Sequence, residues 1–131
     1  MKTVKATREG LIGSESASGY IIDKVVPFVA LPSVNALGKF VRVTNPLNNK
    51  STIAIVLDVG PWNEHDDSYV FGASRPMSED GWRIIYKDYK EDIKELVRDN
   101  KTNKAGIDLG EKVWKLLDMK DNTDVTWEFI S

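Results

Sequence analysis

Two aspartates and the single histidine are the residues whose types suit proton-transfer chemistry. Asp58 ends an apolar run just before Val59-Gly60-Pro61, and Asp108 lies within Gly106-Ile107-Asp108-Leu109. A carboxyl group can donate a proton to a leaving oxygen and accept one from a nucleophile. His65 follows Asp58 by seven residues, and because histidine is a common general acid and base, it is a second candidate proton carrier. These three side chains form the candidate catalytic set.

Structural roles would explain the same residues without any catalysis. An aspartate before a Gly-Pro turn, like Asp58, is common at a strand end. Asp108 with Glu111 three places later has the form of a capping box, which begins a helix. One histidine among adjacent acids fixes no metal geometry, so we expect neither a metal nor a cofactor. The acids beside His65 read as a solvated loop: Glu64, Asp66 and Asp67.

The composition bounds the class of protein. The chain has 131 residues, 18 basic and 20 acidic, a net charge of −2 and no cysteine. This length suits a single domain over residues 1–131. The charge lacks the basic excess of a nucleic-acid-binding protein, and the absence of cysteine excludes a disulfide scaffold and thiol catalysis. Residues 1–8 hold no apolar run, so we expect no signal peptide and no membrane partner. Localisation and oligomeric state stay open.

The first sixty residues alternate short apolar runs with turn signals, a pattern typical of strands. Ile53–Leu57 is apolar at every position, which predicts a strand covered on both faces. The turn cluster Asn45–Lys50 predicts a hairpin over residues 39–58. The strands predicted in this half are Thr3–Thr7, Gly19–Ile22, Val25–Leu31, Lys39–Thr44 and Thr52–Asp58.

The second half carries helical periodicity and a closing strand. Apolar residues recur at three- and four-residue spacing from Trp82 to Val97, which predicts a helix over about residues 81–99. That helix lies in an inserted segment at about residues 62–104. A short helix is predicted from Asp108 onward, and residues 125–129 alternate as a last strand. A last strand can hide an open edge, so the order favours a mainly β fold, a small closed barrel with two helices on its connections.

Five motifs carry a resemblance to a known family. They are Ala6-Thr7, Ser18-Gly19, the run Leu37-Gly38-Lys39-Phe40-Val41-Arg42-Val43-Thr44-Asn45, Asp58-Val59-Gly60-Pro61 and Gly106-Ile107-Asp108-Leu109. In this order they resemble the double-psi β-barrel domain of rare lipoprotein A and its relatives, the expansins and family 45 glycosidases. The match spans most of residues 6–129. It implies a six-stranded barrel in which two loops cross, with a groove that binds polysaccharide, either peptidoglycan or cellulose.

The resemblance also implies roles for particular residues. In the lytic transglycosylases of this group, the Asp of the Asp-Arg-Gly-Pro motif is the proposed acid/base, and that role falls on Asp58. The Asp of the Ile-Asp-Leu motif becomes a carboxylate on the groove floor at Asp108. Aromatic faces bind sugar rings, so Trp62 and Tyr69, with the neighbouring amide of Asn63, are predicted as substrate contacts. The implied partner is a polysaccharide.

Departures from the family pattern bear on activity. Val59 replaces the Arg, Gly110 replaces the Ser after Ile-Asp-Leu, and residues 30–37 lack the His of the lytic members. Either His65 substitutes from another loop, or the site is altered. The leading prediction is an enzyme resembling a lytic transglycosylase that cleaves or binds bacterial cell-wall glycan, with Asp58 as its acid/base. The alternatives are an expansin-like glycan-binding module without turnover, and a structural or assembly protein, phage or secretion related, that kept only the barrel.

Overall fold

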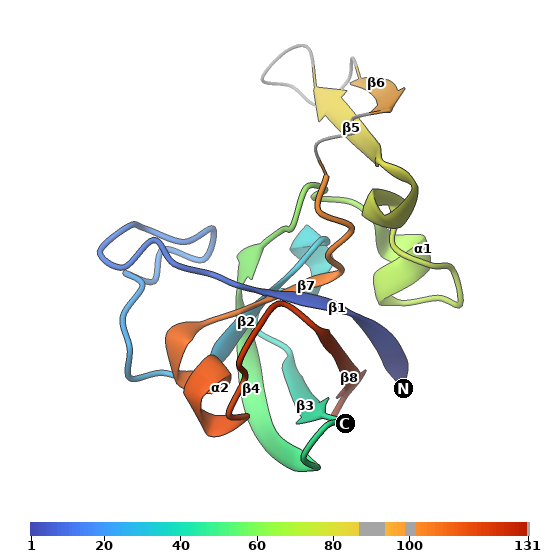
Figure 1. Cartoon of the computed structure of the whole chain (residues 1–131). Coiled ribbons are helices and arrows are strands. Elements are labelled where there is room, and N and C mark those ends of the chain that lie inside the picture. Colours follow the sequence, from blue (N-terminus) through green and yellow to red (C-terminus); the bar gives the residue numbers. More distant parts are fainter. Residues whose placement is uncertain (87–93, 99–101, 131) are drawn as a thin grey trace.

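Six strands close into a barrel in this computed structural model, which describes residues 1–86, 94–98 and 102–130 (Figure 1). The β1–β7 and β2–β4 pairs are parallel, and the other four pairs are antiparallel. The prediction of a mainly β fold built on a closed six-stranded barrel is confirmed. The order around the barrel is β1 (Lys2–Arg8), β7 (Ile107–Leu109), β2 (Phe28–Leu31), β4 (Lys50–Val59), β3 (Phe40–Asn45) and β8 (Asp124–Phe129).

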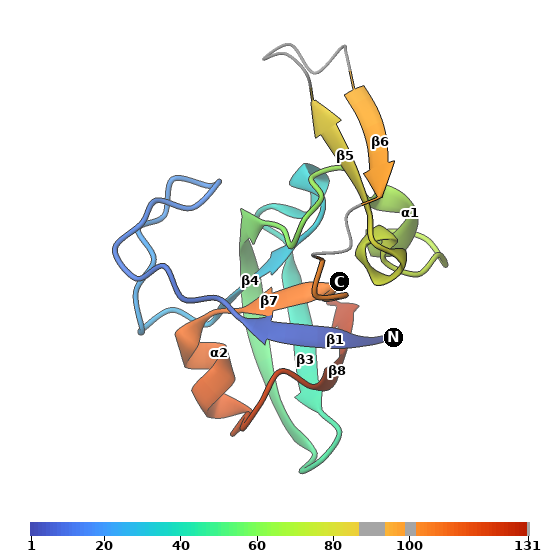
Figure 2. The same cartoon turned by 45° about the horizontal axis from the view of Figure 1, so that its top comes forward.

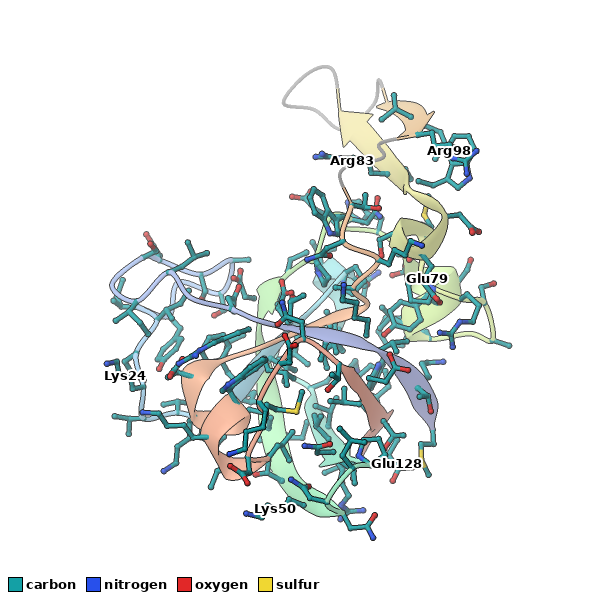
Figure 3. The ribbon with its side chains drawn as sticks, in the orientation of Figure 1. Lys24, Lys50, Glu79, Arg83, Arg98 and Glu128 are labelled. Carbon is teal, nitrogen blue, oxygen red and sulfur yellow. The ribbon has the colours of Figure 1, made fainter. Side chains whose placement is uncertain are left out.

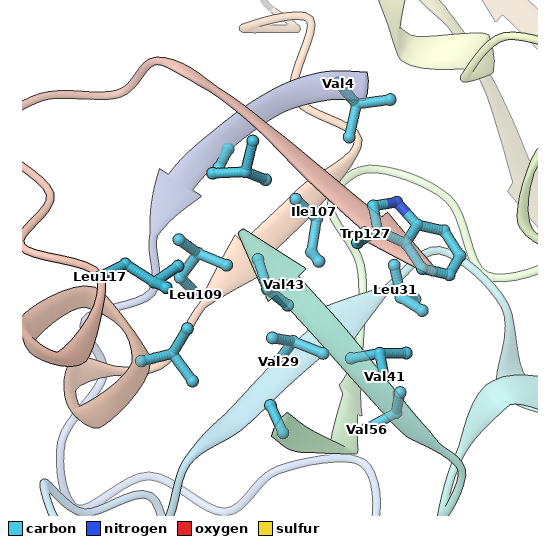
Figure 4. Packing of buried hydrophobic residues seen from close by; sticks show 14 of the residues in the cluster. Val4, Val29, Leu31, Val41, Val43, Val56, Ile107, Leu109, Leu117 and Trp127 are labelled. Carbon is cyan, nitrogen blue, oxygen red and sulfur yellow. The ribbon is translucent and has the colours of Figure 1, made fainter. Parts of the chain in front are cut away.

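Alternate residues of every barrel strand point inward and make one apolar core (Figure 4). This follows from the two-residue repeat of a strand, which sends successive side chains to opposite faces. Burying one such side chain contributes about 1.5–3 kcal/mol. The core also contains Trp114 and Trp127, which are 8% and 1% exposed. The inward strand residues are Val4, Ala6, Val29, Leu31, Val41, Val43, Ala54, Val56, Ile107, Leu109, Val125 and Trp127.

The predicted hairpin over residues 39–58 is present as β3 and β4. Its register pairs Arg42 with Ile53 and Asn45 with Lys50, so the Asn-rich cluster forms the connecting turn. The prediction that the apolar run is covered on both faces is wrong at Ile53, whose side chain is 50% exposed. Its partner Arg42 is exposed too, because this end of the outer barrel face is open to solvent.

A small hairpin over residues 13–22 leaves the barrel after β1 and returns toward the end of β4 (Figure 2). Its two arms are joined by backbone bonds from Gly13 N to Ile22 O, 2.9 Å, and from Ser16 N to Tyr20 O, 2.8 Å. The strand predicted at Gly19–Ile22 is therefore only one arm of this excursion, with a single isolated bridge. The strand predicted at Val25–Leu31 begins later, at Phe28.

The predicted helix over about 81–99 is wrong for its described residues. Trp82–Tyr86 (β5) and Lys94–Arg98 (β6) are strands that pair antiparallel, and residues 87–93 lie outside the described part. Figure 1 shows this hairpin projecting away from the barrel, and Figure 3 places Arg83 and Arg98 on it. Short apolar runs rich in Ile, Val and aromatic residues can form either a helix or a strand. Here the pairing between β5 and β6 makes both segments strands.

Within the described part of the chain, two α-helices lie on the connections. α1 (Asp67–Val70) belongs to the inserted segment and precedes a 3-10 helix at Met77–Asp80, η2. α2 (Glu111–Leu116) follows β7, and a second 3-10 helix at Val34–Ala36, η1, follows β2. Among the described residues, no helix has the length and apolar character needed to cross a membrane.

Candidate functional site

Four residues from four neighbouring strands stand side by side on the barrel. Thr7 of β1 pairs with Asp108 of β7, and Asp108 pairs with Ala30 of β2. On the other side, Ala30 pairs with Asp58 of β4. The two predicted aspartates therefore flank one alanine, with their Cα atoms about two strand spacings, roughly 10 Å, apart. Residues that are 50 positions apart in the sequence meet because the parallel pair of β2 and β4 brings them together.

This row faces outward from the barrel. The residues that precede this row in the three strands point into the core. They are Ala6 before Thr7, Ile107 before Asp108, and Val29 before Ala30. Because successive side chains alternate, Thr7, Asp108 and Ala30 point to the outer surface. A carboxyl group can be tolerated there, whereas inside the apolar barrel an ionised one would be strongly unfavourable.

A β-bulge gives Asp58 the same orientation. Ala54 and Val56 of β4 point inward, so simple alternation would send Asp58 inward as well. The register shifts between Val29 and Ala30: Val29 pairs with Val56, but Ala30 pairs with Asp58. The extra residue, Leu57, turns Asp58 to the outer face beside Ala30. Bulges re-aim side chains in this way next to functional sites.

Asp108 is a strand residue, and the prediction that it caps a helix is wrong. The N-cap of α2 is Gly110, and Asp108 lies within β7. Its Oδ1 accepts a hydrogen bond from the Thr7 hydroxyl. Burial raises the pKa of Asp108 to about 6, the Thr7 hydrogen bond opposes this rise, and the charge of Asp58 adds to it. Asp108 therefore changes protonation near neutral pH.

Asp58 is half-buried and is held by backbone amides. Its Oδ1 accepts hydrogen bonds from Ala17 N at 2.8 Å and from Val59 N at 2.9 Å. Ala17 lies in the turn of the 13–22 hairpin, whose Ser18 N also donates to Leu57 O, 3.2 Å. One carboxyl oxygen of the predicted acid/base is thus committed to main-chain donors, and the hairpin turn rests against the site.

Glu9 is a third carboxyl group at this site, and the sequence analysis missed it. It follows β1, and its N donates to Leu109 O at 2.8 Å, so the β1–β7 ladder continues past Arg8. Glu9 is only 8% exposed, and its Oε2 is buried with no hydrogen-bond donor among the described residues. The signal that could have found it is its spacing, because Glu9 stands two residues after Thr7 and so shares its face.

The environment of Glu9 favours its neutral form. Burial raises the pKa of Glu9 to about 9, and a hydrogen bond with Asp58 and the charges of Asp58 and Asp108 raise it further in the same direction. With its pKa raised to about 9, Glu9 keeps its proton at neutral pH and can act as a hydrogen-bond donor there.

His65 lies along the chain from Asp58 but elsewhere on the barrel. It forms an isolated bridge with Ser33, and Val34 N donates to Glu64 O at 2.8 Å. Ser33 is three residues beyond Ala30, the neighbour of Asp58, which corresponds to about 10 Å along a strand. The backbone of His65 therefore lies beside Ser33, beyond the end of β2, and not in the row that contains the two aspartates.

Trp62 is half-buried at the start of the inserted segment and contacts later residues of that segment. Its indole Nε1 donates to Asn103 Oδ1 at 2.9 Å, and the guanidinium of Arg83 lies 5.6 Å from its ring centroid. A stacked cation of this kind is attracted to the ring face. Trp62 follows the cis peptide bond between Gly60 and Pro61. Of the three predicted sugar contacts, it alone keeps substantial exposed surface.

Asn63 and Tyr69 have structural positions. Asn63 is 3% exposed, and its side chain donates to Trp82 O at 3.1 Å and accepts from Ile84 N at 2.9 Å. Tyr69 is 1% exposed, and its hydroxyl donates to Gly106 O and accepts from Trp127 Nε1. Neither side chain presents a surface that a sugar could reach in this conformation.

The arrangement supports proton transfer better than metal binding. Three carboxyl groups, Glu9, Asp58 and Asp108, come together with the Thr7 hydroxyl, and two of them have raised pKa values. Groups whose pKa values are moved toward neutral pH are characteristic of acid/base sites. Among the described residues, no three histidine, aspartate or glutamate side chains are placed to hold a metal ion.

Comparison with known proteins gives a family but no activity. No curated protein sequence matches this chain. Residues 1–128 match a family described as "Domain of unknown function (DUF8814)". The match covers β1 through nearly all of β8. It therefore includes nearly the whole barrel, with the carboxyl row formed by Thr7, Asp108, Ala30 and Asp58. The chain belongs to this DUF8814 family.

Proposed function

We propose that the chain is a double-psi β-barrel that acts on a polysaccharide, in the first place bacterial cell-wall glycan. The observation that carries the proposal is the outer-face row in which Asp58 and Asp108 flank Ala30. These are the two aspartates whose motifs resemble those of the rare lipoprotein A group. A pair of carboxyl groups is the usual means of cleaving a glycosidic bond.

The strand order supports the double-psi assignment. The barrel closes through two parallel pairs, β1–β7 and β2–β4, that are separated by antiparallel neighbours. The positions of two motifs also support the proposal. Asp58-Val59-Gly60-Pro61 spans the end of β4, and Ile107–Leu109 forms the short strand before α2.

The proposed chemistry is cleavage in the manner of a lytic transglycosylase. A carboxyl group gives its proton to the glycosidic oxygen, and the bond from that oxygen to C1 breaks with its electron pair going to the oxygen. The C6 hydroxyl of the same sugar then attacks C1 and returns its proton to the carboxylate, so no water is consumed. Acid/base assistance of this type contributes roughly 10²- to 10⁴-fold in rate. The Asp108 carboxyl, with its pKa of about 6, can assist in this exchange.

A binding module without turnover is the second candidate function. Two backbone amides already occupy Asp58 Oδ1, which favours a carboxylate that orders the hairpin turn. The exposed part of Trp62, beside Arg83, would then provide a stacking surface for a sugar. In this reading the barrel resembles an expansin and the aspartates stabilise the groove.

Digestion of purified peptidoglycan tests the proposal. We expect the wild-type protein to release soluble fragments with 1,6-anhydro ends, detected by mass spectrometry. Asp58→Asn keeps an oxygen for the Ala17 and Val59 amides but cannot carry the proton, so we expect release to fall at least 100-fold. The exposed Asp80→Asn variant is the matched control and should remain fully active.

The same assay separates the alternatives. Reducing ends in place of anhydro ends would indicate a hydrolase. Co-sedimentation with peptidoglycan without any product would favour the binding module. If the protein neither cleaves nor sediments with the glycan, the polysaccharide proposal fails and a structural role remains.

A further inference from the structure

Glycosidic cleavage at neutral pH needs a stored proton, and the geometry around Glu9 offers one. Glu9 continues the β1–β7 ladder and shares the outward face of Thr7. It is 8% exposed, its Oε2 is buried without a hydrogen-bond donor among the described residues, and interactions with Asp58 contribute to its raised pKa. The third carboxyl group is therefore shielded from solvent, whereas Asp58 is only half-buried.

The contacts of two oxygens distinguish the two carboxyl groups. Asp58 Oδ1 accepts two amide hydrogens, which stabilise it as an acceptor. Glu9 Oε2 is buried and receives no donor from the described residues. A buried ionised carboxylate without donors is strongly unfavourable, whereas a protonated one can donate to the neighbouring carboxylate.

The charges around Glu9 are also negative. The charges of Asp58, on β4, and of Asp108, on β7, both raise the pKa of Glu9. The adjacent cation, Arg8, is engaged elsewhere, because its Nε donates to Glu111 Oε2 at 2.8 Å. The 13–22 hairpin contributes a further acid, Glu15, which is exposed. A proton on Glu9 therefore relieves repulsion between carboxyl groups.

We infer that Glu9 stores the proton that Asp58 delivers to the substrate, which makes Glu9 a positioning residue for acid catalysis. The inference rests on the proposed function, and it deepens it by dividing the acid role between two residues. Glu9 holds the proton in a buried position, and the more accessible Asp58 passes it on.

The proton balance of the step is closed. The O–H bond of Glu9 breaks and an O–H bond on Asp58 forms, which leaves Glu9 ionised. The Asp58 proton then moves to the glycosidic oxygen as its bond to C1 breaks. The attacking C6 hydroxyl returns one proton to Asp58, and Asp58 returns it to Glu9. The pair ends in its initial protonation state without another reactant.

The first test needs no glycan. Carbon-13 NMR of labelled carboxyl groups, recorded from pH 4 to pH 10, follows Glu9 directly, with Glu9→Gln used for assignment. We expect the Glu9 signal to titrate well above pH 7 and to move to lower pH in Asp58→Asn, which removes the neighbouring negative charge. A Glu9 signal that titrates between pH 4 and pH 5 would overturn the inference.

The second test is the pH dependence of glycan release. Glu9→Gln can still donate a hydrogen bond to Asp58 but cannot replenish its proton. We expect kcat/KM at pH 7–8 to fall roughly 10- to 100-fold, while activity recovers toward acid pH, where the solvent supplies the proton instead. Glu64→Gln, at an exposed position, is the matched control. Circular dichroism should show that both variants are folded.

The outcomes distinguish this inference from the proposed function. If the wild-type protein is active and Glu9→Gln has the same rate and pH profile, proton storage is refuted and the glycan function stands. If the wild-type protein cleaves no glycan, the catalytic half of the inference fails together with the proposed function. The NMR titration then decides separately whether Glu9 holds a proton in the resting protein.

Discussion

Single residues at the carboxyl row show how much depends on the local backbone. Asp58 reaches the outer face because Leu57 is an extra residue in β4, and its Oδ1 is held by the amides of Ala17 and Val59. The absence of a side chain at Gly110 also has a specific structural reason. A Cβ built on it would lie 2.5 Å from Cε1 of Phe28, so the Ser that the rare lipoprotein A pattern has at this position has no room here.

The buried Glu9 links the stability of the protein to pH. In the folded chain the pKa of Glu9 is raised to about 9, against an ordinary value of 4.5, so between these values the folded state binds one more proton than the unfolded state. Stability must then fall as pH rises through this window, by at most about 1.4 kcal/mol per pH unit. Glu9→Gln removes this dependence. We expect its thermal midpoint to rise relative to wild type between pH 5 and pH 8.

Calorimetry or fluorescence melts at pH 5, 6, 7 and 8 measure this difference. The Glu64→Gln variant should follow the wild-type curve at every pH, because its side chain is exposed. A constant difference between Glu9→Gln and wild type across the range would show that Glu9 is already ionised in the folded protein at pH 5.

At the scale of elements, the 13–22 hairpin and β4 depend on each other. The turn at residues 16–19 closes with a bond from Gly19 N to Ser16 O, 3.0 Å, and its Ala17 and Ser18 amides donate to the end of β4. The hairpin therefore docks through its turn, at the carboxyl group that we propose acts on the substrate. Any ligand that binds Asp58 Oδ1 must displace the Ala17 amide.

A proline at position 17 tests this docking contact. Ala17 occupies the second position of the turn, where proline is well tolerated, and proline has no N–H to donate to Asp58. We expect Ala17→Pro to speed hydrogen exchange of the Ser18 amide about fivefold, which corresponds to about 1 kcal/mol of docking free energy.

The matched variant for this experiment is Ala17→Ser, which retains the backbone donor. Its Ser18 amide should exchange at the wild-type rate. Equal exchange in the proline variant and in wild type would mean that the turn is held without the Asp58 contact.

At the scale of the whole molecule, Tyr69 joins the inserted segment to the barrel. Its hydroxyl donates to Gly106 O at 2.9 Å and accepts from Trp127 Nε1 at 2.8 Å, and its ring meets the Trp127 ring edge-on. Nearby, Ser78 Oγ donates to Ala105 O at 2.6 Å. The polar side chains of the insertion thus satisfy backbone groups just before β7, the strand that carries Asp108.

Removing the Tyr69 hydroxyl should weaken the entire fold. Tyr69→Phe leaves the buried Gly106 carbonyl without that donor and Trp127 Nε1 without that acceptor. We expect the free energy of unfolding to fall by about 1–3 kcal/mol, seen as a lower urea midpoint with an unchanged m-value. Tyr20→Phe is the control, because the bond from Tyr20 to Asp23 is partly solvated and its loss should cost less than about 1 kcal/mol. Equal effects of the two variants would contradict the anchoring role of Tyr69.

The barrel strands could be predicted from the sequence because their signals are local. Alternation and turn residues located the β3–β4 hairpin and the last strand, and the Asp58 and Asp108 motifs pointed to the residues that now stand in one row. The β5–β6 hairpin could not be predicted, because its apolar spacing fits a helix as well as a strand.

What the amino-acid sequence determined by itself was the mainly β class and the chemical identity of the two aspartates, since periodicity and residue type are properties of the chain alone. Only the tertiary structure decided that Glu9 joins them and that Tyr69 and Asn63 are buried. It also decided that Asp108 belongs to a strand and that a bulge turns Asp58 outward. The physical reason is that burial, register and the sharing of a proton arise between segments distant in sequence, and parallel pairing of strands sets which segments meet.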